Sequence, residues 1–418
     1  KNLYMAVFKP FKAIRPSPEH VKAVASRPYD VLNSDEARVE SYGNNLSFLH
    51  VVKPEIDLPL DTNPYTSEVY EKGRKNFNKL RSSGVLMQDE DASFYIYRIT
   101  MDGRSQIGLV GCCYFEEYFE GIIKKHELTR TAKENDRVNH VECLNANAEP
   151  VFFSYRGKDS IDDLVSEKIK YEPIYNFHAD DGIQHELWLV SKFDDVRIIE
   201  EAFKTVPFLY VADGHHRTAA AARIGQKRKE ENPNHSGLEE YNYFLAVLFP
   251  EDQLKIFDYN RVVKDLNGFS SEDFLTKLEE SFLVTKIEKA DSRPRSIREF
   301  CLYMKSGWYR LLAKEGSWDT QDPVADLDVT ILSEQVLSPL LNITDLRKDN
   351  RIDFVGGIRG LEELEKRVDS GEMKAAFALY PVSMDQLLNI ADAGEIMPPK
   401  TTWFEPKLRS GLFIHDLE

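Results

Sequence analysis

The stretch of sequence that decides the fold is residues 208–222, FLYVADGHHRTAAAA. Its first four residues form a short apolar run of the kind found in buried strands, and Asp213-Gly214 ends that run. The alanine-rich part that follows favours a helix that can pack closely on a sheet. A strand that leads directly into a helix is typical of layered α/β structure.

The start of this predicted helix suits an anion. Gly214 has no Cβ that would obstruct a phosphate, and the N–H groups of the first helical turn have no partner within the helix. Arg217 adds a planar set of donors. The sequence therefore predicts phosphate or nucleotide binding by the residues of this turn, which are Gly214, His215, His216, Arg217 and Thr218.

A structural interpretation of the same turn remains open. Asp213 could cap the helix, and the two histidines could bond to nearby carbonyl groups. Adjacent histidines on a helix point about 100° apart, so they do not chelate one metal ion, and we assign no metal ligands.

The segments on either side of this stretch extend the α/β pattern. The hairpin signal Asp102-Gly103 joins two β-rich runs, residues 92–101 and 105–115. Further strands are expected at 150–155, 185–190, 242–250 and 254–263, and helices at 66–84 and 192–205. The sequence thus predicts an α/β or α+β fold with a mixed sheet and flanking helices.

A smaller α+β unit is expected after Asn267-Gly268. Its predicted elements are a helix at 270–282, a strand at 283–289, a helix at 296–303 and a strand at 308–315. A chain of 418 residues also exceeds the usual size of one domain. We place the boundary near residue 265, with a main domain at 1–265 and a smaller unit at 266–418 whose C-terminal tail returns to the main domain.

Composition disfavours some classes of function. The chain has 54 Lys and Arg residues against 70 Asp and Glu residues, a net charge of −16, so a nucleic acid would be repelled at long range. No apolar run is long enough to predict a membrane span, and the opening residues do not resemble an export signal, so we expect a cytoplasmic location.

Three polar blocks supply further candidates. In residues 121–140, His126, Glu127, Lys133 and Arg137 could contact a polar substrate, although the block taken alone favours a solvated helix with ion pairs. In residues 27–58, Glu36 is a candidate general base, with a carboxylate at a helix N-terminus as the alternative. The remaining candidates for lining the site are Asn45, Lys407 and Arg409.

These blocks, taken in order, resemble a bacterial family known as "domain of unknown function 1015". The resemblance rests on FKPFKAIRP, RPYDVLNSDEA, NNLSFLHVVKPEIDLP, IKKHELTRTAKENDRVNH, YVADGHHRTAAA and PPKTTWFEPKLRSGL. The segment VADGHHRTAAA is also similar to the nucleotide-phosphate motif of the ParB and sulfiredoxin-like superfamily, which includes free-serine kinases. Sulfiredoxins have a catalytic cysteine in this motif, whereas this chain has His215, so sulfinic-acid reduction is not expected.

The resemblance, together with the predicted phosphate site, implies an enzyme that uses ATP or ADP with Mg²⁺ to phosphorylate a hydroxylated or amino-acid-like metabolite. Glu36 matches the base of the serine kinases, and Asp213 is a second candidate for orienting or deprotonating the acceptor. The alternatives are a nucleotide-responsive regulator of ParB type that binds DNA or protein, and a phosphatase or hydrolase. The expected partner is a small molecule rather than nucleic acid or a membrane, and the sequence does not predict the oligomeric state.

Overall fold

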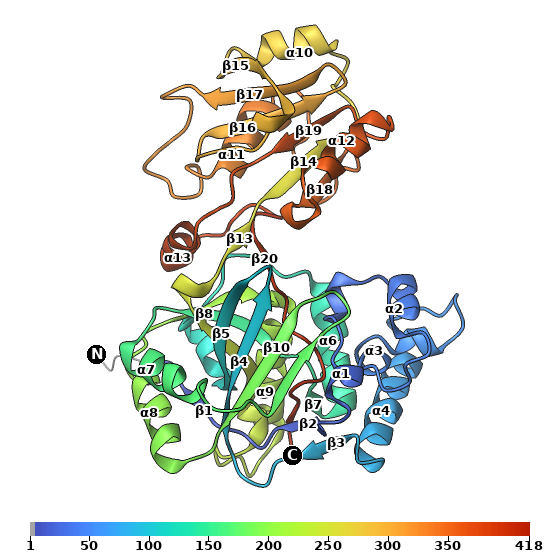
Figure 1. The fold of residues 1–418 in the computed structure, drawn as a ribbon, viewed down its shortest axis with the longest axis vertical. Helices are drawn as coiled ribbons and strands as arrows, with labels where there is room; N and C mark the ends of the chain where they lie inside the picture. The colour runs from blue at the N-terminus through green and yellow to red at the C-terminus, as the bar shows by residue number, and fades with distance from the viewer. Residues whose placement is uncertain (1–4) are drawn as a thin grey trace. The chain divides into compact units, whose positions relative to one another are not determined.

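The computed structural model describes residues 5–418 and divides the chain into two compact units (Figure 1). Unit 1 extends to Leu254 and includes the C-terminal segment Pro406–Glu418, and unit 2 is Lys255–Glu405. Residue 265, where the sequence analysis places the boundary, lies within unit 2. Among residues 5–418, no helix has both the length and the apolar character that crossing a bilayer requires.

Unit 1 is built on a mixed sheet, as expected from the sequence. Within the described residues the sheet has nine strands in the order β6-β11-β8-β12-β5-β4-β10-β9, with β1 paired to β5. The pairs β11–β6 and β12–β8 are parallel, and the other pairs are antiparallel. The strands are β1 (Phe8–Lys9), β4 (Phe94–Met101), β5 (Arg104–Tyr114), β6 (Ile123–Lys124), β8 (Val151–Tyr155), β9 (Tyr175–His178), β10 (Gln184–Val190), β11 (Leu209–Asp213) and β12 (Tyr243–Pro250).

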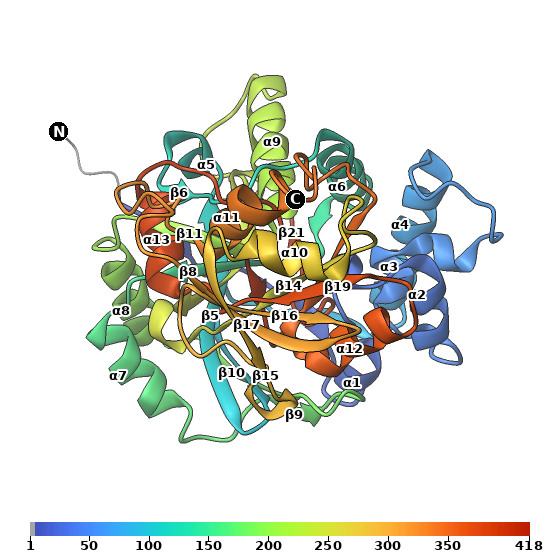
Figure 2. The same cartoon turned by 90° about the horizontal axis from the view of Figure 1, so that it is seen from above.

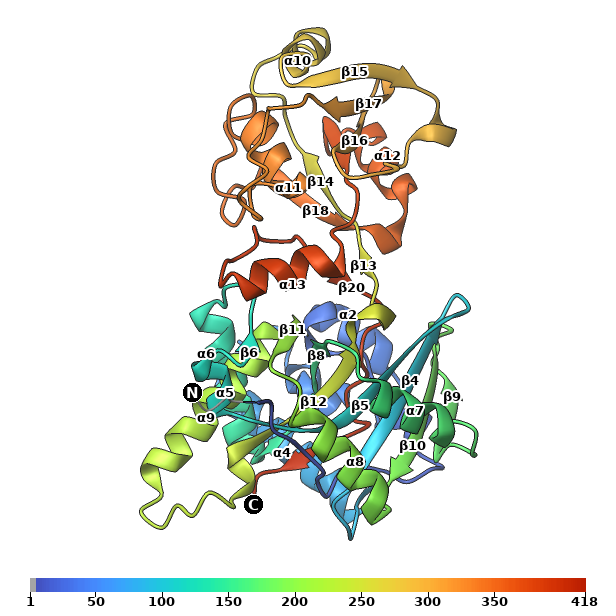
Figure 3. The same ribbon diagram turned by 90° about the vertical axis from the view of Figure 1, so that its left-hand side faces the viewer.

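Two apolar cores hold the helices of unit 1 in place. One core joins the sheet to α7 (Asp159–Lys168) and α8 (Phe193–Phe203), which lie side by side (Figures 1 and 3). The other core lies among the N-terminal helices, where α3 (Leu49–Val52) packs beside α4 (Ser67–Ser82) (Figure 2). The remaining elements are α1 (Val21–Val24), α2 (Ser34–Ser41), α5 (Glu116–Glu120), α6 (Thr131–Leu144), α9 (His215–Glu231), η1 (Tyr29–Val31), η2 (Pro54–Asp57), η3 (Glu240–Asn242), η4 (Glu251–Gln253), and the short strands β2 (Ile14–Pro16), β3 (Leu86–Gln88), β7 (Ala146–Asn147) and β21 (His415–Asp416).

Unit 2 contains an antiparallel sheet of its own. Its strand order is β15-β17-β16-β19-β14-β18, and a separate ribbon pairs β13 (Ile256–Phe257) with β20 (Trp403–Phe404). The sheet strands are β14 (Tyr259–Val263), β15 (Phe282–Ile287), β16 (Glu299–Met304), β17 (Gly307–Ala313), β18 (Ile352–Gly356) and β19 (Ala375–Ala378). The helices are α10 (Ser271–Leu278), α11 (Asp328–Leu332), α12 (Leu361–Asp369) and α13 (Met384–Asp392), with a π-helical turn η6 (Ser333–Leu337) and the 3₁₀ turns η5 (Lys289–Asp291) and η7 (Gly357–Arg359).

One predicted element of unit 2 is wrong. The sequence analysis expects a helix at 296–303, but the structure has strand β16 over most of that range. β16 forms a hairpin with β17, and the tight turn is closed by Gly307 at φ +111°. Both faces of β16 are covered, which removes the polar-apolar alternation that would have marked a strand in the sequence.

The contact of α9 with α5 gives a first prediction. A Cβ added to Gly225 of α9 would lie 2.5 Å from Cγ of Phe115, a ring that is buried in the core of unit 1. Gly225→Ala is therefore expected to lower the free energy of unfolding by about 1–2 kcal/mol, because overpacking outweighs the gain in helix propensity. Chemical denaturation measures the change, and Gln226→Ala at the exposed neighbouring position is the control. A variant as stable as the wild type would show that α5 and α9 can separate without cost.

Candidate functional site

The start of α9 is a helix N-terminus that no side chain caps. Gly214 precedes the helix with φ +87°, a conformation that glycine adopts without strain. A Cβ at this position would lie 3.1 Å from Nε of Arg217, so the guanidinium rests directly against the glycine backbone. The first backbone bond of the helix is from Thr218 N–H to the Gly214 carbonyl, at 2.9 Å, and the Thr218 hydroxyl donates to the same oxygen. Thr218 thus stabilises the first turn of the helix with two hydrogen bonds to one carbonyl oxygen.

Several polar groups at this turn have no protein partner within residues 5–418. No side chain caps α9, and the backbone N–H groups of His215, His216 and Arg217 donate to no described acceptor. His215 Nε2 and Arg217 Nε are buried and also have no partner among the described atoms. Buried polar atoms are normally satisfied, so this turn has unused capacity for an oxygen-rich ligand.

Arg217 links two carboxylates and a backbone carbonyl. Its Nη1 donates to the Pro150 carbonyl at 2.7 Å, and its Nη2 lies 3.6 Å from Asp30 and 4.0 Å from Asp213. Burial by itself would lower the pKa of Arg217, but Asp30 and Asp213 raise it above its ordinary value. The guanidinium therefore stays charged, and its position is fixed from three sides.

Asp213 is held by its own contacts. One carboxylate oxygen accepts the Gly214 N–H at 2.9 Å, and the other lies 3.1 Å from Lys407 Nζ. Burial acts to raise the pKa of Asp213, but Lys407 and Arg217 outweigh it and hold the pKa well below the ordinary range. Asp213 is thus an ionised anchor for two cations, and the structure brings the predicted residue Lys407 to the start of α9.

The histidines near this turn are uncharged at neutral pH. Burial lowers the pKa of His126 to about 4. Burial is also the main reason why the pKa of His215 lies well below its ordinary value, and the neighbouring His126 lowers it further. The two rings meet edge to face, with centroids 4.6 Å apart, and Glu127 lies 3.9 Å from His215 Nδ1. His216 Nε2 accepts the Arg130 N–H at 3.0 Å, and burial lowers the pKa of His216 as well. Any anion here would be bound by neutral N–H donors and by the two cations Arg217 and Lys407. Imidazolium charge would not contribute.

A polar cavity of about 240 Å³ adjoins Arg217 through Asp30. We call it the Asp30 cavity. Segments far apart in the sequence form its wall: η1, the start of α2, η2, the residues around Val69 and one face of α6. Its charged lining residues are Asp30, Lys53, Glu55, Lys133, Asp136 and Arg137, and tyrosines 29, 65 and 70 add hydroxyl groups and ring surfaces. Positive and negative groups thus share one small space.

The buried charges of this cavity are paired. Arg137 donates to Asp136 at 2.7 Å, lies 3.5 Å from Glu149, and stacks 3.9 Å from the Tyr29 ring centroid. Glu55 accepts the Ser34 hydroxyl at 2.8 Å and pairs with Lys53 at 3.2 Å. These contacts fix the wall before any ligand binds, which reduces the entropy cost of binding.

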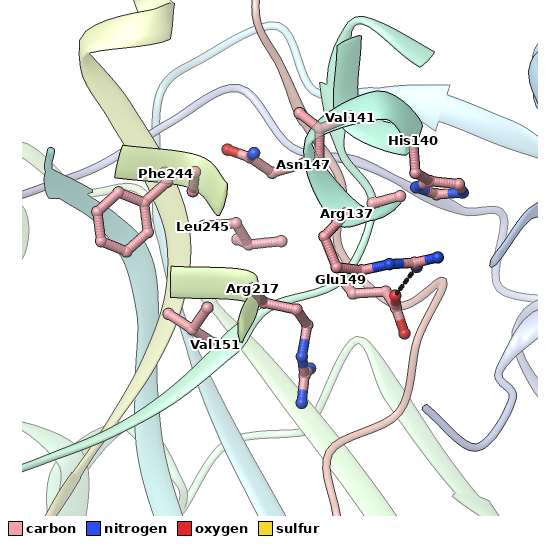
Figure 4. A pocket seen from close by; sticks show the side chains of 11 residues that line it. Arg137, His140, Val141, Asn147, Glu149, Val151, Arg217, Phe244 and Leu245 are labelled. Carbon is pink, nitrogen blue, oxygen red and sulfur yellow. Dashed lines mark hydrogen bonds and ion pairs between the residues drawn. The ribbon is translucent and has the colours of Figure 1, made fainter. Parts of the chain in front are cut away.

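A second, much smaller cavity shares Arg137 and His140 with the Asp30 cavity. Its volume is about 20 Å³, and Arg137, Glu149 and Arg217 are among the residues that line it (Figure 4). Figure 4 shows Arg137 joined to Glu149 by a dashed line, with Arg217 projecting from α9 in a different direction. The space suits about one water molecule. Arg217 and Arg137 therefore line one small cavity, whose other walls are largely apolar.

The structure does not bring all predicted residues to this site. Glu36 is exposed in a capping box of α2, where it accepts the Asn33 N–H at 2.8 Å, and it does not line the Asp30 cavity. Asn45 lines a different groove. Arg409 is buried against His185 and Asp181, on β10 and the turn before it.

Sequence reasoning also missed residues of the cavity. Asp30 lies in RPYDVLNSDEA and Glu55 in NNLSFLHVVKPEIDLP, but neither residue has a local pattern that indicates a site. Lys53-Pro54-Glu55 reads as a turn, and Glu55 is nevertheless only 5% exposed. Burial of that carboxylate depends on packing between distant segments, which the sequence does not display.

A comparison with the curated proteins found no match. Among solved structures, similarity extends to a conserved hypothetical protein from Pyrococcus furiosus, at 14% identity and TM-score 0.36, covering 72% of this chain and 93% of that one. A free serine kinase in complex with AMP is similar at 12% identity and TM-score 0.37, covering 73% and 90%. SbnI with a C-terminal truncation, from Staphylococcus aureus, is similar at 10% identity and TM-score 0.40, covering 73% and 87%. Similarity at this level assigns no ligand or residue role to this chain.

The family comparison covers most of the chain. It matches residues 8–330, which include the whole sheet of unit 1, the start of α9 and the Asp30 cavity. The same region contains five of the six sequence blocks on which the resemblance was based. The chain belongs to the family described as protein of unknown function (DUF1015).

Proposed function

We propose that unit 1 is a phosphotransferase that binds the phosphates of ATP or ADP at the start of α9 and a small hydroxylated or amino-acid-like metabolite in the Asp30 cavity. The observation that carries this proposal is the set of unpartnered polar groups at one helical turn: three backbone N–H groups, His215 Nε2 and Arg217 Nε. A helix N-terminus with an adjacent guanidinium is a well-suited phosphate site.

Asp30 connects the two halves of the proposed site. Its carboxylate lines the cavity and lies 3.6 Å from Arg217 Nη2, so an acceptor hydroxyl in the cavity could reach both Asp30 and a phosphoryl group held by Arg217. In the proposed transfer, the acceptor oxygen forms a bond to phosphorus, the bond from phosphorus to the leaving nucleotide oxygen breaks, and the acceptor proton passes to Asp30. Arg217 neutralises the charge that develops on the phosphoryl oxygens.

This assignment differs from the one that the sequence suggested. Asp213 already accepts the Gly214 N–H and pairs with Lys407, so in our proposal it positions Arg217 and Lys407 rather than removing a proton. Glu36 keeps its role as a helix cap. The base is then Asp30, with Glu55 and Lys53 as contacts for the polar groups of the acceptor.

The residues present fit nucleotide phosphates better than they fit a bare metal ion. The unpartnered backbone groups and Arg217 Nε at the turn are N–H donors, and no cluster of three or more potential His, Cys, Asp or Glu ligands occurs in the part of the chain that the structure describes. Mg²⁺ needs only one or two carboxylates when phosphates supply the other oxygens, so the lack of such a cluster is compatible with binding of the nucleotide as its Mg²⁺ complex. When bound, Mg²⁺ would neutralise phosphate charge.

The test has a binding arm and a transfer arm. Calorimetry with ATP and ADP, with and without Mg²⁺, should show saturable binding, and no heat at millimolar nucleotide would reject the proposal. Metabolite screening with ATP, read by mass spectrometry, should then identify a phosphorylated product. Nucleotide binding without any product would support a regulator and reject the transferase.

A pair of variants distinguishes the two candidate bases. Asp30→Asn is expected to bind nucleotide within about threefold of the wild type and to lose about 10²–10⁴-fold in transfer rate, because the general base is removed. Glu36→Gln is expected to keep the wild-type rate. The opposite result, a loss in Glu36→Gln and full activity in Asp30→Asn, would show that Glu36 is the base and that Asp30 is not.

A further inference from the structure

A second hollow in unit 1 lies outside the proposed active site. It is a groove of about 430 Å³ between the turn before α3, η2 and α4, and we call it the Lys79 groove. It shares no lining residue with the Asp30 cavity. Residues Val69 and Tyr70 of α4 line the cavity, whereas Lys72, Asn76 and Lys79 of the same helix line the groove. The two hollows are therefore independent binding spaces on either side of one helix.

The groove contains a prebuilt polar network. His50 Nδ1 lies 2.7 Å from Asp57 and His50 Nε2 lies 3.1 Å from the Asn44 carbonyl. Both partners offer acceptor oxygens, so the His50 ring is held from two sides. Asn76 donates to the other Asp57 oxygen at 2.8 Å and to the His50 carbonyl at 2.7 Å. The network therefore leaves the single carboxylate of the groove fully engaged.

The charge that remains in the groove is positive. Asp57 is the single acid of the groove; it contacts His50 at 2.7 Å, and Lys72 lies 3.5 Å from the same carboxylate. Burial acts to raise the pKa of Asp57, but the contacts with His50 and Asn76 lower it, so the carboxylate remains ionised. Lys79 forms no ion pair with any described residue. Two ammonium groups, on a protein of net charge −16, thus face a space with no free acid.

We propose that the Lys79 groove binds a small organic oxyanion, a carboxylate or phosphate group carried on a short apolar body. Lys72, Lys79 and the exposed amide of Asn45 contact the oxyanion, and Leu46 and Leu80 form the apolar part of the groove wall. This assignment gives Asn45, which the proposed active site does not use, a place in a binding site. It does not depend on the proposed phosphotransferase activity.

Ligand-observed NMR titration of the full chain tests the proposal with four probes: butanoate, butyl phosphate, inorganic phosphate and the neutral butanamide. At least one of the first two should bind saturably, butanamide should not, and which of the two binds more tightly identifies the oxyanion. Inorganic phosphate should bind more weakly than butyl phosphate, since it lacks the apolar body. Saturable binding of butanamide, or of no probe, would overturn the proposal.

Two variants locate the site. Lys79→Ala is expected to weaken binding of the preferred anion at least tenfold, whereas Lys75→Ala, which removes the same charge from α4 outside the groove, should leave it unchanged. Equal losses in both variants would mean that only net charge attracts the anion, and the groove assignment would fall. Asp30→Asn should bind the anion like the wild type, so a failed active-site proposal leaves this one standing.

Discussion

Replacing Arg217 by alanine is expected to abolish nucleotide binding and to lower the free energy of unfolding by about 3 kcal/mol. The side chain is only 8% exposed and lies between Asp30, Asp213 and the Pro150 carbonyl. Its removal leaves the carbonyl without a donor and two carboxylates without their shared cation. Calorimetry with ATP and Mg²⁺ measures the first effect, and urea denaturation measures the second.

Two further variants separate binding from folding. Arg217→Lys keeps a positive charge between the carboxylates, so most of the stability should return. A lysine cannot donate to the Pro150 carbonyl and to a phosphate in the planar arrangement of a guanidinium, so nucleotide affinity should stay at least about tenfold reduced. Arg223→Ala, on the exposed side of α9, is the control for charge and should change neither quantity appreciably. Wild-type nucleotide affinity in Arg217→Lys and in folded Arg217→Ala would reject the phosphate site.

The parts of the fold that the sequence predicts well are those with strong local signals. Residues 208–222 give β11, Gly214 and the start of α9 as expected, because an apolar run, a glycine and an alanine-rich segment each favour one conformation. The hairpin of β4 and β5 follows from Asp102-Gly103, which adopt φ +51° and +76° in the turn. In both places the decisive residues lie within a few positions of one another.

The wrong element shows the limit of local signals. Residues 296–303 contain both polar and apolar side chains at helical spacing, but β16 is selected by pairing with β17 on one side and β19 on the other. β19 lies more than seventy residues further along the chain. Hydrogen bonds to so distant a partner override a weak helical preference, and no window of the sequence contains both.

The candidate site likewise has one part that local sequence predicts and one part that depends on distant segments. The first turn of α9 could be predicted because its donors are consecutive residues. The Asp30 cavity could not, because η1, η2, α4 and α6 contribute to it from positions 29 to 140. Glu36 and Glu55 illustrate the difference: the sequence favours Glu36 at a visible helix start, but packing buries Glu55 and leaves Glu36 at the surface.

A buried carboxyl group in α5, that of Glu117, gives the second prediction with a large expected effect. This effect is on the stability of the fold alone. Glu117 is only 2% exposed; its Oε1 accepts the Val7 N–H at 2.7 Å, and its Oε2 has no partner among residues 5–418. Burial raises the pKa of Glu117 to about 8 from an ordinary value of 4.5. The folded protein thus keeps a proton on this group at neutral pH, whereas the unfolded chain releases it.

The sign of the pH dependence follows from proton binding. Below about pH 4.5 the group is protonated in both states, and between 4.5 and 8 the folded state binds more protons than the unfolded state, so stability falls as the pH rises. Glu117→Gln cannot ionise and its amide oxygen still accepts the Val7 N–H. We therefore expect the variant to match the wild type within about 1 kcal/mol at pH 5 and to exceed it by about 2–4 kcal/mol at pH 9.

Urea denaturation at a series of pH values measures this difference, with Glu90→Gln at an exposed position away from Glu117 as the control. The control curve should run parallel to that of the wild type across the series, because an exposed carboxyl group is solvated in both states. If Glu117→Gln also ran parallel to the wild type, the group would be ionised in the folded protein. The segment around Val7 would then have to open enough for water to reach Oε2, and its docking against α5 would be weaker than the 2.7 Å hydrogen bond implies.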